Sequence, residues 1–223
     1  MKRVMRLPIL AVTLGCLLSG CEQKTATPPT PAPQKQLASA GTIVAAGDSL
    51  TAGYGVNETE AYPAQLEKKL QADGYNWRVV NAGISGETSS GTLSRITWIL
   101  KLKPDIVILE TGANDGLRGV DPKVTQKNIS ETVRLLKESN VTIILAGMRM
   151  VTSMGPEFTH SFAAIYPAVA KEHGLTLIPF FLQGVAGNPA LNQEDGIHPL
   201  PEGYRIITDM IYPYLAPAMT VKK

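Results

Sequence analysis

The stretch Thr42-Ile43-Val44-Ala45-Ala46-Gly47-Asp48-Ser49-Leu50 decides the fold of this chain. Its first five residues form a short apolar run, which is typical of a buried strand. Glycine, aspartate and serine then end the run and place a hydroxyl group directly after the strand. In open α/β sheets, ligands bind at the carboxyl ends of the strands. Ser49 is therefore a candidate nucleophile, provided that the chain also supplies partners for it.

Candidate partners lie near the other end of the chain, in Asp195-Gly196-Ile197-His198-Pro199. A serine hydroxyl needs a base within hydrogen-bond reach, and the histidine side chain suits that task at neutral pH. The base in turn needs an acceptor that fixes its tautomer, and Asp195 can reach back to Nδ1 of His198. Each motif alone has a simpler interpretation, a turn at Gly47–Ser49 and a turn into a helix at Asp195–Pro199. Their joint occurrence at opposite ends of one α/β domain favours a catalytic triad.

Two further strands end in turns that contain glycine, at Val79–Gly86 and at Ile106–Gly116. In a parallel sheet, these turns fall on the same edge as Ser49. Acyl transfer requires hydrogen-bond donors aimed at the developing oxyanion. The backbone N–H groups of Ser49 and Gly83 and the side-chain amide of Asn114 are the candidate donors. The alternative is that Gly83 only permits a tight turn and that Asn114 forms an Asx turn.

The rest of the chain after residue 40 alternates between strand-like and helix-like segments. Such alternation predicts an α/β fold with a parallel sheet covered by helices on both faces. We expect right-handed crossovers, and Asp121-Pro122 has the cap and first-turn residues that begin a helix. The expected strands are 42–46, 77–81, 105–110, 142–147 and 175–179, and the expected helices are 61–73, 86–101, 122–139, 158–173 and 201–216.

The four motifs together resemble those of the GDSL, or SGNH, hydrolase family. The resemblance covers residues 41 to 217 and is closest to the bacterial multifunctional acyl-CoA thioesterase I, lysophospholipase L1 and arylesterase group. It implies that Ser49, Gly83, Asn114 and His198 are the family's four named residues, with Asp195 completing the triad. It also implies a three-layer αβα sandwich, flavodoxin-like, with about five parallel strands in the order 2-1-3-4-5.

The resemblance further implies a serine esterase that hydrolyses carboxylic esters or thioesters through an acyl-enzyme, without a metal or another cofactor. A carbohydrate O-acetylesterase and a lipoprotein that binds acyl lipids without turnover are the alternatives. The methionines of Met148–Met154 suit an adaptable surface for acyl chains, or they only pack the core. The segment Gly112–Gly119 is a candidate flap over the site. Asp48 and Asp115 are expected to be supporting hydrogen-bond acceptors and Glu110 a structural residue.

Residues 1–20 have the features of an export signal, with a basic start followed by a short apolar run. The run ends in Leu18-Ser19-Gly20-Cys21, which resembles a bacterial lipoprotein signal whose cysteine is acylated. An ordinary secretory signal is the alternative. Residues 21–40 then form the acylated cysteine and a proline-rich tether, and residues 41–223 the hydrolase domain. Glu22 favours the periplasmic face of the outer membrane under this resemblance.

Charge and cysteine content agree with this division. Removing residues 1–20 takes away three basic residues and no acidic ones, which changes the net charge from +2 to −1. No basic stripe remains, so we expect no nucleic-acid partner. Both cysteines, Cys16 and Cys21, precede the domain, which therefore has to fold on its apolar core rather than on disulfides. The expected partners are a small ester or lipid substrate and the membrane, and the domain is expected to be a monomer.

Overall fold

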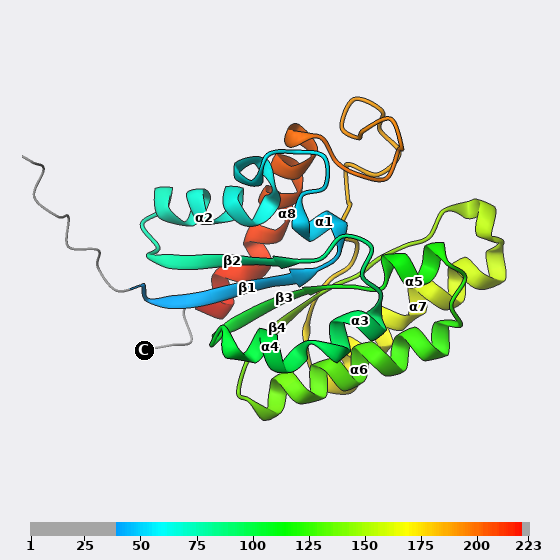
Figure 1. Ribbon diagram of the computed structural model, residues 1–223, viewed down its shortest axis with the longest axis horizontal. Coiled ribbons are helices and arrows are strands. Elements are labelled where there is room, and N and C mark those ends of the chain that lie inside the picture. Colours follow the sequence, from blue (N-terminus) through cyan, green and yellow to red (C-terminus); the bar gives the residue numbers. More distant parts are fainter. Residues whose placement is uncertain (1–38, 220–223) are drawn as a thin grey trace, which may run out of the picture. The chain divides into compact units, whose positions relative to one another are not determined.

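The computed structural model describes residues 39–219, which form a five-stranded parallel sheet with the order β2-β1-β3-β4-β5 (Figure 1). This order and the expected position of each strand are confirmed, with bounds that differ by a few residues. The parallel pairing brings the carboxyl ends of the strands to one edge; for example, Gly47 pairs with Gly83. The strands are β1 (Gly41–Gly47), β2 (Trp77–Gly83), β3 (Ile106–Glu110), β4 (Thr142–Ala146) and β5 (Thr176–Ile178).

Helices cover both faces of the sheet, which confirms the three-layer αβα sandwich (Figure 1). Helices α2 (Tyr62–Ala72) and α8 (Pro201–Met219) pack together on one face. The other face carries α3 (Ser89–Ser94), α4 (Ile96–Lys101), α6 (Pro122–Glu138) and α7 (Pro156–His173). The remaining elements are short: α1 (Ser49–Ala52), α5 (Ala113–Leu117), η1 (Glu58–Glu60) and η2 (Thr152–Met154).

The expected helix 86–101 is wrong as a single element, because α3 and α4 are separated at Arg95. The backbone of Arg95 leaves the helical region, with φ −106° and ψ 11°. The candidate flap Gly112–Gly119 contains the helix α5. Helix α6 begins as expected, with Pro122 in its first turn and the Asp121 side chain accepting a hydrogen bond from Lys123 N.

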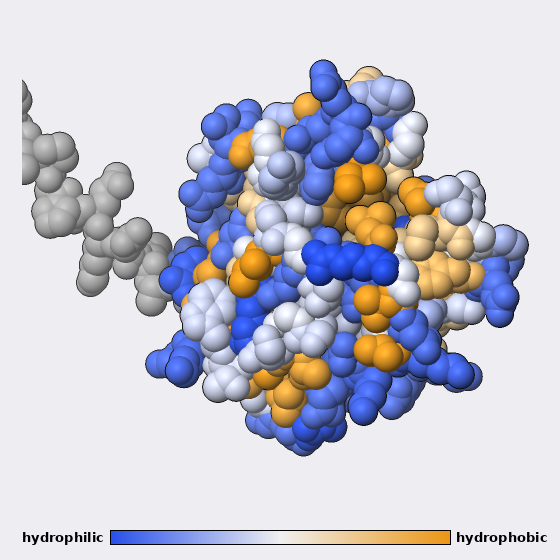
Figure 2. All heavy atoms as spheres, turned by 45° about the vertical axis from the view of Figure 1, so that its right-hand side comes forward, coloured by the Kyte–Doolittle hydropathy of each residue, from blue (hydrophilic) through white to orange (hydrophobic). Residues whose placement is uncertain are grey.

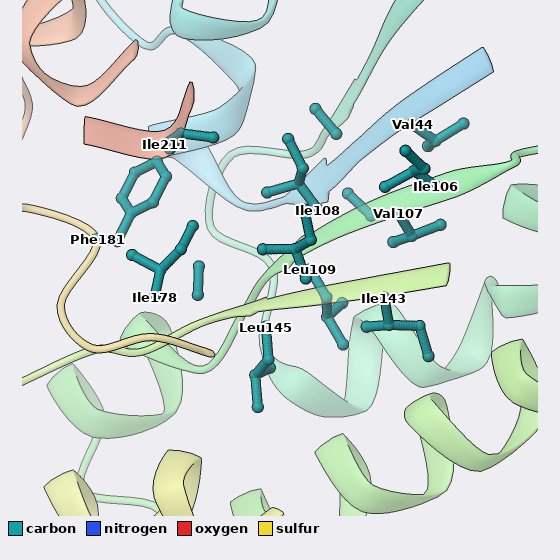
Figure 3. Close-up of a cluster of buried hydrophobic side chains, with 14 of the residues drawn as sticks. Val44, Ile106, Val107, Ile108, Leu109, Ile143, Leu145, Ile178, Phe181 and Ile211 are labelled. Carbon is teal, nitrogen blue, oxygen red and sulfur yellow. The ribbon is translucent and has the colours of Figure 1, made fainter. Parts of the chain in front are cut away.

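The core lies on both faces of the central strands (Figure 3). All five residues of β3 are buried, as a strand covered by two helical layers requires. Figure 3 shows Ile178 and Phe181 close to Ile211 of α8, whereas Leu145 points from β4 in the opposite direction. Burying each such side chain contributes about 1.5–3 kcal/mol. The packed sheet gives the loops at its carboxyl edge a rigid base.

The predicted signal 1–20 and nearly all of the predicted tether 21–40 lie outside the described residues. Within residues 39–219, no helix combines the length and the apolar character needed to cross a membrane.

Candidate active site

Ser49 lies at the start of α1, directly after β1, as the strand-to-turn pattern predicts. The preceding residue, Asp48, is the N-cap of this short helix, and its Oδ1 accepts a hydrogen bond from Leu50 N at 3.0 Å. Asp48 is buried, so its carboxylate fixes the turn from beneath. The Ser49 N–H has no hydrogen-bond acceptor within residues 39–219. The turn therefore presents a hydroxyl and an unpaired N–H side by side.

His198 and Asp195 lie against this serine in one hydrogen-bonded chain. Nε2 of His198 is 2.8 Å from Ser49 Oγ, and Nδ1 of His198 is 2.7 Å from Asp195 Oδ2. The structure thus brings together the three residues predicted as a triad, although they are far apart in the sequence. The arrangement allows His198 to take the serine proton while Asp195 holds the other ring nitrogen.

Hydrogen bonds within the loop that carries Asp195 and His198 hold the two side chains in place. Oδ1 of Asp195 accepts the backbone N–H groups of Ile197 and His198, each at 3.0 Å, and Gly196 turns the chain with φ +74°. Gln193 N closes the loop by donating to His198 O at 2.8 Å. Partial burial raises the pKa of Asp195, but the hydrogen bonds from His198, Ile197 and the His198 backbone outweigh it and hold the pKa at about 2. Asp195 is therefore ionised at neutral pH.

Tyr54 is a site residue that the sequence reasoning missed. Its ring packs on the His198 ring, with centroids 4.7 Å apart and planes inclined by 43°. Its carbonyl oxygen accepts a hydrogen bond from Gln193 Nε2 at 2.7 Å, which ties the serine loop to the histidine loop. The available signal was its position between Gly53 and Gly55, whose φ values of +81° and +78° give this loop a conformation that favours glycine.

The prediction that Gly83 supplies an oxyanion donor is wrong. The Gly83 N–H donates to Asn81 Oδ1 at 3.0 Å, so it is already paired. Gly83 instead allows α1 to pack closely against the end of β2, because a Cβ on residue 83 would lie 2.2 Å from Ala52 N in α1. Three residues on, Gly86 lines the site cavity with φ +79°, and its N–H has no acceptor in the described part of the chain. Gly86 is the glycine of this turn that faces the site.

Asn114 lies beside the serine turn, as predicted, at the start of α5. One N–H of its side chain donates to Asp48 Oδ2 at 3.0 Å, which leaves the second N–H of the amide free of that bond. Asp115 accepts hydrogen bonds from the N–H and the hydroxyl of Ser89. Asp48 and Asp115 are thus hydrogen-bond acceptors for neighbouring groups, which confirms the role expected for them.

A second carboxyl group is buried beneath the turn. Oε2 of Glu110 accepts the Asp48 N–H at 3.1 Å and the Thr51 hydroxyl at 2.9 Å. Burial raises the pKa of Glu110 well above its usual range, and the charge of Asp48 adds to this. Burial also raises the pKa of Asp48, against the hydrogen bonds that it accepts. Glu110 thus holds the turn without facing the cavity, in agreement with the structural role predicted for it.

A largely apolar cavity of about 360 Å³ opens over Ser49 and His198. Met148 and Met150 pack against the core and also line this cavity, so these methionines do more than fill the core. Figure 2 shows hydrophobic residues gathered on the face that lies to the right in Figure 1. The apolar lining residues are Leu50, Ala113, Leu117, Met148, Met150, Val151, Leu182, Ala186 and Ile197.

Comparison with known proteins agrees with this geometry. Residues 45–206 match the model of the GDSL-like Lipase/Acylhydrolase family. The chain is 37% identical to Esterase TesA of Pseudomonas aeruginosa over 185 residues, which are 82% of this chain and 92% of that protein. It is 39% identical to Thioesterase 1/protease 1/lysophospholipase L1 of Escherichia coli over 81% of this chain and 86% of that protein.

A crystal structure of TesA superposes with a TM-score of 0.77 at 37% identity, covering 79% of this chain and 99% of that one. The family match covers the end of the strand that leads to Ser49, the Gly86 and Asn114 turns and the Asp195–His198 loop. The chain therefore belongs to the GDSL-like lipase/acylhydrolase family.

Proposed function

We propose that this protein is a serine esterase that hydrolyses carboxylic esters and thioesters through an acyl-enzyme. The observation that carries the proposal is the hydrogen-bonded chain Ser49–His198–Asp195 at the base of an apolar cavity. Ser49 and Gly86 both line this cavity, and their backbone N–H groups have no acceptor among residues 39–219. A nucleophile, a base with its acceptor and donors for an oxyanion are the groups that acyl transfer requires.

The reaction follows from these positions. His198 Nε2 takes the proton of Ser49 Oγ as the oxygen attacks the ester carbonyl, and ionised Asp195 stabilises the imidazolium that forms. The N–H groups of Ser49 and Gly86 and the free amide N–H of Asn114 donate to the tetrahedral oxyanion. The alcohol or thiol leaves with the proton from His198. Water then attacks the acyl-enzyme with the same base and restores Ser49.

The names of the relatives support a range of activated and lipid-like esters. They are an esterase, a thioesterase that is also a lysophospholipase, and an arylesterase. The apolar lining of the cavity gives a physical reason why this chain would accept acyl groups longer than acetate. We therefore place arylesters, lysophospholipids and acyl thioesters within its substrate range.

The test compares p-nitrophenyl esters of increasing acyl length with wild type and Ser49→Ala. We expect hydrolysis by wild type, with a preference beyond acetate, and a loss of about four to six orders of magnitude in kcat for Ser49→Ala. Ser130→Ala is the matched control, since Ser130 Oγ also lies 2.7 Å from a histidine, Nε2 of His173, but on the surface between α6 and α7.

Two outcomes would favour other functions. Release of acetate from acetylated glycans, with no activity on longer esters or lysophospholipid, would point to a carbohydrate O-acetylesterase. No turnover of any ester, with lipid retained through purification, would point to an acyl-lipid-binding protein. Either result would contradict the proposal.

We further propose that Cys21 is acylated and that the domain acts in the cell envelope, tethered to the periplasmic face of the outer membrane. The support is the sequence of residues 1–22: a basic start, a short apolar run, Leu18-Ser19-Gly20-Cys21 and then Glu22. Export to the periplasm without an anchor is the alternative. An envelope location agrees with lipid esters as natural substrates and separates the enzyme from intracellular acyl-CoA.

A further inference from the structure

Arg95 and Glu87 form a buried ion pair behind the active-site edge of the sheet. Nε of Arg95 lies 2.6 Å from Glu87 Oε1, and Nη2 lies 2.7 Å from Glu87 Oε2. The two side chains are only 12% and 5% exposed. The two parallel bonds match the planar guanidinium to the planar carboxylate, which fixes the position and also the orientation of each group. Neither residue lines the cavity.

The same guanidinium connects three segments of the site. Its Nη2 also donates to Ala82 O near the end of β2 at 2.8 Å and to Gly47 O at the end of β1 at 3.4 Å. Gly47 O accepts Ile84 N at 2.9 Å as well, so the two strand ends are joined twice. The strand that leads to Ser49 and the strand that leads to Gly86 are therefore held by one side chain.

Glu87 directly follows Gly86 and is itself held from several directions. Its Oε2 accepts the Thr92 hydroxyl at 3.0 Å, and its N–H donates to Ile84 O at 3.1 Å, which closes the turn. A Cβ on Gly91 would lie 2.7 Å from Glu87 Cγ, so only glycine leaves room for the Glu87 side chain there. Fixing Glu87 in this way fixes the neighbouring Gly86, which lines the cavity.

We propose that the Glu87–Arg95 pair positions the Gly86 N–H relative to Ser49, so that both N–H groups point at one oxyanion. This inference rests on the proposed esterase function and makes Glu87 and Arg95 positioning residues for it. A buried ion pair adds little net stability, because desolvation offsets the attraction. The pair instead acts by fixing the position of Gly86 relative to Ser49. A misplacement of about 1 Å near reacting atoms lowers a rate by up to about 100-fold.

The test uses Arg95→Lys, which keeps the charge but loses the planar fork. A second variant, Glu87→Gln, keeps the shape and one hydrogen-bond acceptor. The matched control is Arg205→Lys, because Arg205 makes a similar fork with Glu202 on the exposed face of α8. For each protein, active sites are titrated with a serine-directed phosphonate. Then kcat and KM for p-nitrophenyl butyrate and the Kd of an alkyl boronic acid, which forms a tetrahedral anion on serine, are measured.

We expect kcat per titrated site to fall about 10- to 100-fold in both variants, with KM within threefold of wild type. The boronic acid should bind more weakly by a similar factor, whereas Arg205→Lys should match wild type. Wild-type kcat per site and wild-type boronate affinity in both variants, whatever their melting temperatures, would overturn the positioning role alone. A wild-type protein that hydrolyses no ester would overturn the proposed function and this inference with it.

Discussion

At the scale of single residues, three carboxyl groups near Ser49 have pKa values shifted in different directions: one is lowered and two are raised. Asp195 lies near the surface, and its hydrogen bonds hold its pKa at about 2 against the opposing effect of partial burial. Asp48 and Glu110 are buried, and burial raises the pKa of both. Ionised Asp195 is therefore suited to stabilising the positive charge of a protonated His198. The two buried groups serve the turn that carries Ser49, and only Asp195 contacts the base.

Glu110→Gln should change how stability depends on pH. Because the folded protein holds the Glu110 proton more tightly than the unfolded chain, the contribution of Glu110 to stability is complete below its usual pKa of 4.5. It is lost as the pH rises through the higher folded value. Glutamine does not titrate, so the stability of the variant relative to wild type should increase from pH 4.5 upward, by at most about 1.4 kcal/mol per pH unit.

Urea unfolding of both proteins between pH 4 and pH 9 measures this difference directly. Glu58→Gln is the control, since Glu58 is exposed at the start of η1. A difference in unfolding free energy between Glu110→Gln and wild type that stays constant over this pH range would show that the pKa of Glu110 is not raised in the folded protein.

At the scale of elements, the hydrophobic pattern of the sequence predicted the strands of the sheet well. It did not predict the short helices or the break at Arg95. The continuous apolar runs before Gly47 and Glu110 mark strands buried on both faces, so β1 and β3 were predictable. Helices α1 and α5 have four and five residues, too few to show a helical period. The break at Arg95 depends on its contacts with Glu87 and with two strand ends, which no local pattern contains.

In the candidate site, likewise, the sequence predicted some residues and not others. Ser49, Asn114, Asp195 and His198 could be placed because each residue type has a specific chemical task in acyl transfer. The glycine proposed as an oxyanion donor could not be placed, since that role would fall to a backbone N–H, which every residue except proline has. Choosing between Gly83 and Gly86 requires knowing that the Gly83 N–H already donates to Asn81 and that Gly86 lines the cavity.

Gly83→Ala tests the role that the structure gives to this glycine. The new Cβ would lie 2.2 Å from Ala52 N, so α1 must move away from β2. We expect a loss of about 1–3 kcal/mol in unfolding free energy and a lower kcat, because α1 carries Ser49. Gly74→Ala is the control: Gly74 has φ +84° but no atom within 4 Å of the added Cβ. It should lose about 1 kcal/mol and keep its kcat. Unchanged stability and kcat in Gly83→Ala would contradict the close approach.

At the scale of the whole molecule, the site depends on both ends of the folded region. Ser49 follows the first strand, whereas His198 comes shortly before the last helix, and the sheet brings them within 2.8 Å. The cavity above them has an apolar lining suited to acyl chains. Tethering through the proposed lipidated Cys21 would keep this cavity close to a membrane surface, where a lipid ester would be present.

Cys21→Ala should therefore release the full-length protein from membranes without changing its catalytic rate. One acyl chain binds a bilayer only marginally, and several chains on one cysteine anchor stably. The measurement is the fraction of esterase activity that sediments with membranes after expression of the whole chain in a Gram-negative bacterium. Cys16→Ala is the matched control, because it changes the other cysteine of the same segment and leaves Cys21 in place. Equal sedimentation of wild type and Cys21→Ala would exclude lipidation at this residue, and release of wild type by salt alone would exclude a lipid anchor altogether.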